Sequence, residues 1–255
     1  MYIPKKIMNI VQGEIPQKDQ MGMSGSHVYL FSNWVLKIHE TQERVLKKEY
    51  EVLRWLKGKL PVPDVLAYIE HKTYSYLLMT KLPGVMTCDQ SVLEKPYEMI
   101  KHLVKGLKML WNVDTKDCPF QNGLLEKLKT ARRNIDMNDV DVTQAEENTY
   151  GEKGFKDPEE LYQWLVKNQP PEELVFTHGD YCLPNVFVDE NDITGFIDFD
   201  RTGIACRWAD MSLVVRSIYH NFGHHEAYID ALFHELGIVP DWDKIRYYIL
   251  LDELL

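Results

Sequence analysis

The sequence predicts an α+β protein in two parts, a small antiparallel sheet with one helix followed by a larger, mainly helical part. Three observations support this prediction. Four short strand-like runs lie within the first 80 residues. A segment with proline and glycine, Thr80–Gly84, then interrupts the pattern. The residues after it carry apolar positions three and four apart, which is typical of amphipathic helices.

Length and charge restrict the classes of function. A chain of 255 residues allows one large domain or two modest ones. The net charge of −10, from 39 acidic and 29 basic residues, argues against nucleic acid and anionic membranes as partners and permits a cationic small molecule. An acidic surface that merely keeps the protein soluble explains the charge equally well.

Cysteine usage and the start of the chain favour the cytoplasm. The four cysteines show no metal or CxxC spacing, which is typical of free thiols in a reducing compartment. The residues after Met1 lack the apolar segment of a signal peptide, and no apolar run approaches the length of a membrane span. We therefore expect a cytoplasmic protein that needs no membrane, and no obligate protein partner is evident.

The first part reads as a four-stranded sheet with one helix. Val28–Phe31 and Trp34–Ile38 flank Ser32-Asn33 as a hairpin, and Val65–Ile69 and Tyr74–Met79 add two strands. The residues from 44 to 60 read as the helix.

The turn that precedes the first strand, Gly22–Ser26, is a candidate phosphate-binding loop. Backbone N–H groups of a glycine-containing turn can surround phosphate oxygens, and Ser24 and Ser26 would add hydroxyl donors. It is not a GxGxxG motif, and such a turn alone is usually an ordinary loop.

Lys37 and Glu49 form a candidate ion pair. Lys37 interrupts an apolar strand, and Glu49 falls on the apolar stripe of the following helix. A lone lysine in a strand usually faces solvent, but an acid on a buried stripe needs a partner. A strand lysine paired with a helix glutamate holds nucleotide phosphates in kinase folds.

The second part reads as helices around an acidic loop. Helices are expected over Pro96–Trp111, Leu124–Ile135, a segment starting at Asp157, Met211–Tyr219 and Asp241–Leu255. Residues 136–154 are polar and acidic, which is typical of a surface loop. Arg207 and Asp210 are interpreted as a buried structural pair. His224 and His225 read as a solvated turn without a third metal ligand.

The chemistry is concentrated between Val175 and Phe199. His178-Gly179-Asp180 is followed by Asn185, and two short strands joined by a polar turn then lead to Asp198. Because a hairpin brings its open ends together, Asp180, Asn185 and Asp198 are expected to converge. A catalytic-loop Asp, an Asn five residues later and a metal-binding Asp beyond a hairpin form the site of protein kinases. No activation-loop pattern with A-P-E follows Asp198, which disfavours a protein substrate.

Several segments resemble the bacterial aminoglycoside 3'-phosphotransferases, or kanamycin kinases. They are HGDYCLPN, GFIDFDR, RWAD, VRSI and the ending YYILLDELL, and the similarity extends from Gly22 to Leu255. The resemblance implies a two-lobed, protein-kinase-like fold. Its expected parts are an N-lobe over 1–80, a hinge over 81–84 and a C-lobe over 85–255.

The resemblance also implies cofactors and site residues. ATP, with GTP as a possible substitute, and Mg²⁺ are the expected cofactors. The implied nucleotide-binding residues are Ser24, Ser26, Lys37, Glu49, Lys81, Leu82, Phe187 and Ile197, with the backbone of Lys81 and Leu82 bonding adenine. Asn185 and Asp198 would hold the metal, and Asp180 would accept or orient the sugar hydroxyl.

Aminoglycosides are polycations, and the implied substrate-binding residues are mostly acidic. They are Glu147, Asn148, Asp180, Arg201, Asp252, Glu253 and the carboxylate of Leu255, with Glu146 as a further acid of the loop. The loop at 136–154 is expected to close over the drug, and the last helix to carry the C-terminal acids into the sugar site.

Two positions depart from the family pattern. His220 stands where the family often has Glu, which removes one expected cation contact. Asp200 stands where the family often has Gly, and is either an extra acid near the metal or a residue that faces solvent. Two other functions stay open: a kinase of the same fold acting on another hydroxylated amine or a macrolide, and a non-catalytic nucleotide-binding scaffold. The intact set Lys37, Glu49, Asp180, Asn185 and Asp198 disfavours the scaffold.

Overall fold

The computed structural model describes residues 2–19, 26–40 and 45–255, which form two compact units. Unit 1 comprises Met1–Met86 and Val186–Asp200, and unit 2 comprises Thr87–Asn185 and Arg201–Leu255. The segment Val186–Asp200 thus belongs with the N-terminal sheet, whereas a single boundary near residue 84 would assign it to the second part.

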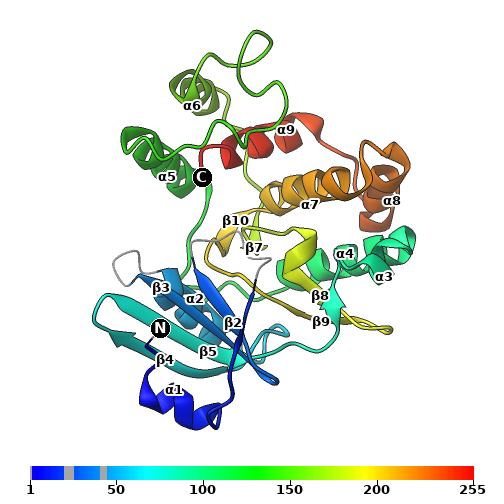
Figure 1. Cartoon of the computed structure of the whole chain (residues 1–255). Helices are drawn as coiled ribbons and strands as arrows, with labels where there is room; N and C mark the ends of the chain where they lie inside the picture. Colours follow the sequence, from blue (N-terminus) through cyan, green and yellow to red (C-terminus); the bar gives the residue numbers. More distant parts are fainter. Residues whose placement is uncertain (1, 20–25, 41–44) are drawn as a thin grey trace. The chain divides into compact units, whose positions relative to one another are not determined.

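The main sheet of unit 1 has five antiparallel strands in the order β1-β2-β3-β5-β4 (Figure 1). The strands are β1 Gln17–Lys18, β2 His27–Leu30, β3 Trp34–Glu40, β4 Val65–His71 and β5 Tyr74–Thr80. Two helices accompany the sheet, α1 Lys5–Ile10 and α2 Val45–Leu56.

The two faces of this sheet contact different helices. Leu36 and Ile38 of β3 pack in one apolar cluster with Ile7 of α1. Because successive side chains of a strand point to opposite faces, Lys37 lies on the other face. Helix α2 contacts β3, β4 and β5 and buries Glu49 among its apolar residues. Strand alternation and the helical stripe therefore bring Lys37 and Glu49 together.

A second sheet of unit 1 carries the residues around the central motif. Its order is β6-β8-β9, with β6 Val85–Met86, β8 Val186–Val188 and β9 Ile193–Phe196. Gly84 enters β6 with φ 82°, and a Cβ there would lie 2.1 Å from the carbonyl oxygen of Val188. Only glycine permits this close approach of the two strands.

Unit 2 is built from helices around a two-stranded sheet. The helices are α3 Gln90–Leu93, α4 Pro96–Trp111, α5 Leu124–Asp136, α6 Pro158–Lys167, α7 Arg207–Phe222, α8 Glu226–Leu236 and α9 Trp242–Asp252. Strand β7 (Leu174–Thr177) pairs with β10 (Gly203–Cys206), and the 3₁₀ turn η2 spans Leu183–Asn185. Helix α7 contacts α4, α8, α9 and both strands, which explains why most of its residues are buried.

The α+β prediction is confirmed, and most predicted elements are present within a few residues. Helix α7 begins at Arg207 rather than at Met211, because Trp208, Ala209 and Asp210 of its first turn are already buried. The predictions omitted α1, α3, α8, β1, β6, β7 and β10. Residues 137–157 form neither helix nor strand, in agreement with the expected loop.

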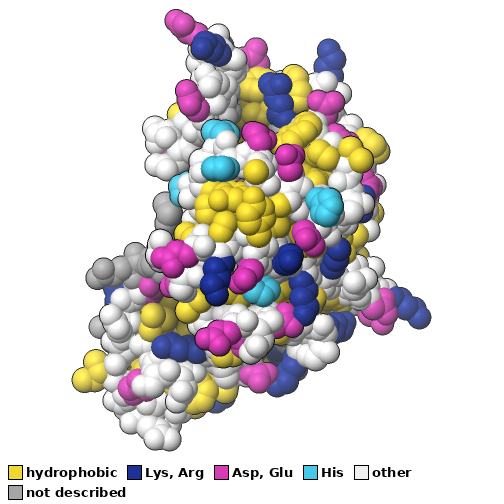
Figure 2. All heavy atoms as spheres, turned by 90° about the vertical axis from the view of Figure 1, so that its right-hand side faces the viewer, with side chains coloured by type: hydrophobic (Ala, Val, Ile, Leu, Met, Phe, Trp, Pro, Cys, Tyr) yellow, Lys and Arg dark blue, Asp and Glu magenta, His cyan; other side chains and the backbone are white. Residues whose placement is uncertain are grey.

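The surface of the face drawn in Figure 2 shows acidic and basic side chains interspersed, without a continuous basic area. Among the helices of the described residues, none combines the length and apolar character needed to cross a membrane.

Candidate active site

A buried carboxylate fixes the loop that follows β7. Asp210 is fully buried in the first turn of α7 and accepts the backbone N–H groups of His178, at 2.7 Å, and of Gly179, at 2.9 Å. Burial raises the pKa of Asp210, whereas the charge of His178 and the two N–H bonds oppose this increase. The sequence-based pairing of Asp210 with Arg207 is wrong. Arg207 bonds Glu173 instead, at 2.5 Å, and the two short N–H bonds occupy Asp210.

Gly179 allows the loop to approach the chain at Arg201. Its φ is +88°, and a Cβ would lie 1.9 Å from the carbonyl oxygen of Arg201. Any other side chain at this position would displace the residue that follows it, Asp180.

Asp180 and Asn185 are held together within unit 2. The side-chain amide of Asn185 donates to the backbone carbonyl and to Oδ2 of Asp180, both at 2.9 Å. Asn185 is buried and Asp180 is partly exposed. Since its amide nitrogen is engaged, Asn185 has its amide oxygen left for a cation, while Asp180 keeps an acceptor in reach of solvent.

Lys37 forms a buried charge cluster within unit 1. Its Nζ donates to Glu49 Oε1 at 2.7 Å and also to Asp198 Oδ1. Burial lowers the pKa of Lys37, but the carboxylates of Glu49 and Asp198 outweigh burial and raise it well above its ordinary value. Burial raises the pKa of Glu49, and Lys37 opposes this shift while Asp198 and Asp200 add to it. Lys37 therefore stays cationic at any physiological pH.

Asp198 leaves part of its carboxylate accessible. Its side chain is 42% exposed, although one oxygen accepts from Lys37. Its φ of +61° is a left-handed conformation that Asp tolerates better than most residues and that is frequent at functional sites. Val186 pairs with Phe196 at the open end of the β8–β9 hairpin. Asn185 directly precedes this end in the chain, and Asp198 follows it by two residues.

The segment predicted to bind adenine lies against the hairpin. A Cβ on Gly195 of β9 would lie 2.6 Å from the side chain of Leu82, so glycine makes room for this leucine. Phe187 and Ile197 are half-buried on the same hairpin. The N–H of Lys81 donates to the carbonyl of Asn33 at 3.0 Å, so this donor is engaged in the sheet.

Of the two serines expected to contact the phosphates, the structure describes Ser26. The hydroxyl of Ser26 bonds Nδ1 of His39 at 3.0 Å. Ser24 lies outside the described residues.

The end of the chain carries a second charge cluster, in unit 2. Asp252 is bonded by Arg201, at 2.9 Å, and by Arg216 of α7. Burial raises the pKa of Asp252, but the two guanidinium groups prevail and lower it below its ordinary range. Asp252 and Arg201, both predicted to bind substrate, are thus bonded to each other.

Glu253 connects the last helix to the acidic loop. Its carboxylate accepts the N–H of Glu146 at 3.1 Å, and burial raises its pKa. The carboxylate of Glu146 lies 4.0 Å from Arg216. Glu147 and Asn148 are exposed, and Leu255 is half-buried at the end of the chain.

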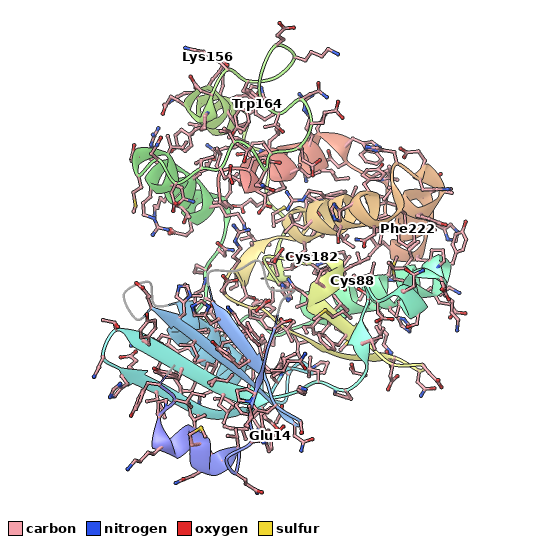
Figure 3. The ribbon with its side chains drawn as sticks, viewed as in Figure 1. Glu14, Cys88, Lys156, Trp164, Cys182 and Phe222 are labelled. Carbon is pink, nitrogen blue, oxygen red and sulfur yellow. The ribbon has the colours of Figure 1, made fainter. Side chains whose placement is uncertain are left out.

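Aromatic side chains secure the far end of the same loop. Trp164 of α6, labelled in Figure 3, has ring-centroid distances of 5.8 Å to Phe155 and 6.1 Å to Tyr247 of α9. The loop is thus held at Glu146 by polar contacts and at Phe155 by packing.

Sequence reasoning missed the roles of Asp210 and Arg216. Arg216 is the one charged residue of the segment 211–218 within α7, and Asp210 directly precedes this segment. A charge in a helix that is mostly buried needs a partner. The interpretation of His224 and His225 as solvated residues was also incomplete, because His224 contacts the ring of Tyr219 and His225 that of Tyr228. Within the described residues, no three His, Cys, Asp or Glu side chains form a metal site.

Comparisons with known proteins agree with this geometry. Residues 21–248 match the model of the phosphotransferase enzyme family. An aminoglycoside 3'-phosphotransferase of Enterococcus faecalis is 38% identical over 100% of this chain and 98% of its own. One of Niallia circulans is 38% identical over 98% of this chain and 96% of its own.

Solved structures show the same fold. An aminoglycoside-3'-phosphotransferase of type VIII has a TM-score of 0.80 at 24% identity and covers 94% of both chains. An aminoglycoside phosphotransferase of Streptomyces rimosus has a TM-score of 0.84 at 24% identity, covering 98% of this chain and 95% of that one. The latter enzyme has also been solved in complex with ADP and streptomycin.

Proposed function

The chain belongs to the aminoglycoside 3'-phosphotransferases of the phosphotransferase enzyme family, and from this premise we propose that it transfers the γ-phosphoryl group of ATP to the 3'-hydroxyl of an aminoglycoside. This activity would give resistance to kanamycin- and neomycin-type antibiotics. The observation that supports it most is the bonding of Lys37 to both Glu49 and Asp198, because this lysine is the residue that contacts nucleotide phosphates in the kinase fold.

The proposed nucleotide contacts are made by residues of unit 1. Lys37 neutralises the α- and β-phosphates, and Glu49 fixes the direction of its ammonium group. Leu82, Phe187 and Ile197 supply apolar contacts for the base, with the N–H of Leu82 and the carbonyl of Lys81 as polar partners.

Asn185 and Asp198 suit Mg²⁺. An amide oxygen and a carboxylate are ligands that this ion accepts, and Mg²⁺ in nucleotide sites usually takes only one or two carboxylates together with phosphate oxygens. Asn185 and Asp198 would hold the ion, which would supply positive charge to neutralise the charge that develops on the transferred phosphate.

Asp180 orients the attacking hydroxyl. Asp210 fixes the loop before it and Asn185 fixes its carboxylate, so Asp180 can accept the proton of a sugar hydroxyl without losing its position. A loose phosphoryl-transfer transition state asks little of a base, and positioning is the main contribution of this residue.

Glu147, Glu253 and the carboxylate of Leu255 are the proposed contacts for the ammonium groups of the drug, with Asn148 as a polar neighbour. Asp252 acts with Arg201 at this end of the chain and supports the contacts that Glu253 and Leu255 make. His220, exposed at the end of α7, adds no anionic contact. Because the phosphoryl donor is ATP, the proposed location is the cytoplasm.

A coupled ADP-release assay with kanamycin, choline and erythromycin side by side tests the proposal. We expect turnover with kanamycin alone, and faster turnover with ATP than with GTP. Turnover with choline or erythromycin in its place would assign the chain to another small-molecule kinase. ATP binding without turnover on any acceptor would favour a nucleotide-binding scaffold.

A further inference from the structure

Lys127 is a buried lysine of unit 2 that lies near Asp252 and near the helix turn that carries Asp210, and the mechanism above does not use it. Lys127 is in the first turns of α5, where lysine normally reaches solvent, yet only 6% of the residue is exposed. A buried ammonium group is costly unless anionic or polar partners compensate for its lost hydration.

The surroundings of Lys127 come from three helices and the chain end. It lines a cavity of about 10 Å³, large enough for a single water molecule, where α5 meets α7 and α9. Ala209 and Leu213 line this cavity from α7, and Asp252 and Leu255 line it from the end of the chain. Ala209 directly precedes Asp210. Lys127 thus lies beside the helix turn that fixes the catalytic loop and beside the acid that bonds Arg201 and Arg216.

The charge of Lys127 acts on both acids. Burial raises the pKa of Asp210, and among the groups that oppose this are His178, the two loop N–H groups and Lys127. On Asp252, Lys127 acts in the same direction as Arg201 and Arg216, and all three oppose the effect of burial. The further ionisable groups here are Tyr181, whose pKa is raised by burial and by Asp210, Tyr248 in the cavity wall, and Glu146 and Glu253 beside Arg216.

We propose that Lys127 is a positioning residue of the phosphotransfer site, whose buried ammonium group holds Asp210 and Asp252 in place and so couples the catalytic loop to the substrate-binding end of the chain. The proposal rests on the function proposed above. Asp210 acts on the reaction indirectly, because it fixes the backbone of His178 and Gly179, which precede Asp180. Asp252 acts on substrate binding through Arg201 and through the residues that follow Asp252 in the chain. Lys127 itself touches neither substrate.

Three variants separate this role from simple packing. Lys127→Met keeps the length of the side chain and removes its charge, Lys127→Gln keeps a donor, and Lys127→Arg keeps the charge. Lys129→Met is the matched control, because Lys129 lies on the same helix with a side chain 60% exposed and forms an ion pair with Glu126 of its own helix.

The pH profile of kcat with kanamycin is the decisive readout. Without the charge of Lys127 the pKa values of Asp210 and Asp252 rise, so both acids become protonated at a higher pH. We expect the acidic limb of the kcat profile to move to higher pH by about one unit in Lys127→Met and Lys127→Gln, with kcat at pH 7.5 reduced about tenfold to a hundredfold. The KM for kanamycin should rise and the KM for ATP should hold. Lys127→Arg should restore both values, and Lys129→Met should match wild type.

The possible results are distinguishable. Folded neutral variants whose acidic limb coincides with that of wild type would overturn the positioning role. If both neutral variants fail to fold while Lys127→Arg folds, Lys127 serves stability and the proposal also fails. A wild-type protein that is inactive on kanamycin would refute the proposed function instead, since each variant is compared with wild type in the same assay.

Discussion

At the scale of single residues, the candidate site combines groups that are fixed with groups that stay accessible. Asp210, Glu49 and Asn185 are buried, whereas Asp180 and Asp198 keep part of their carboxylates exposed. Asn185 bonds the carboxylate of Asp180, Asp210 fixes the backbone of the two residues before Asp180, and Glu49 shares its partner Lys37 with Asp198. Such a division is expected where a hydroxyl and a metal must be positioned before reaction.

Asp180 should matter most for turnover. Asp180→Ala removes the acceptor of the sugar hydroxyl, so kcat should fall by about 10²–10⁴, the usual range for a general base or a hydroxyl-orienting group. ATP affinity should change little, because Lys37 and Glu49 remain. Steady-state kinetics together with equilibrium ATP binding measure both quantities. Near-normal turnover of the purified variant would remove Asp180 from the mechanism.

Asp198 and Asn185 should differ in their dependence on Mg²⁺. Asp198→Ala removes the charged ligand and should abolish turnover at every Mg²⁺ concentration, whereas Asn185→Ala should only raise the concentration needed for half-maximal rate. A titration with Mg²⁺ at saturating ATP measures this difference. If Asp198→Ala keeps its activity in the presence of EDTA, the metal assignment is incorrect.

At the scale of elements, sequence periodicity located most helices and strands but not the contacts between them. The apolar stripe of α2, together with the central motif between Val175 and Phe199, predicted the Lys37–Glu49 pair, because strand alternation and helical spacing are both readable locally. The partners of Arg207, Asp210 and Arg216 were not predictable. They come from the residue before β7, the catalytic loop and α9, and sequence separation carries no information about which charges meet after folding.

Short or amphipathically weak elements were also missed. Strand β10 follows the central motif between Val175 and Phe199, and it becomes recognisable as a strand only through its pairing with β7. The division into two units was not predictable for the same reason: the β8–β9 hairpin belongs to unit 1 because β8 pairs with β6, a strand that the sequence did not predict.

The last helix offers a test of cation recognition. Glu253→Gln, and separately a short Gly-Ser extension that displaces the carboxylate of Leu255, should each raise the KM for kanamycin by about tenfold or more, since a hydrogen bond to a charged group contributes about 1.5–3 kcal/mol. The KM for ATP should hold. Asp243→Asn is the matched control, because Asp243 is an exposed acid in the first turn of the same helix.

An unchanged kanamycin KM in both variants, with the fold intact by circular dichroism, would restrict cation recognition to the loop around Glu147.

The Asp252 cluster should contribute to stability in a pH-dependent way. The folded-state pKa of Asp252 is lowered, so its contribution is present above the unfolded value of about 4 and is lost as the pH falls through the folded value. Asp252→Asn should therefore be less stable than wild type at pH 6, and the difference in Tm should shrink as the pH approaches 3. A difference that stays constant with pH would show that the ion pairs with Arg201 and Arg216 are not its source.

At the scale of the whole molecule, the account places nucleotide contacts in unit 1 and acceptor contacts in unit 2. Lys37, Glu49 and Asp198 belong to the first, and Asp180, Asn185 and the acidic chain end belong to the second. The family relationship, at 38% identity over the whole chain, supports one reaction that uses both sets. The net charge of −10 is in keeping with a polycationic acceptor.

The central claim is that the acceptor is the 3'-hydroxyl, and ADP release with kanamycin and tobramycin tests it most directly. Kanamycin carries this hydroxyl and tobramycin lacks it, while both are polycations of similar shape. The account predicts steady turnover with kanamycin, no turnover with tobramycin, and competitive inhibition of the kanamycin reaction by tobramycin. ADP release with tobramycin at a rate comparable to that with kanamycin would contradict it and would place the reaction at another hydroxyl.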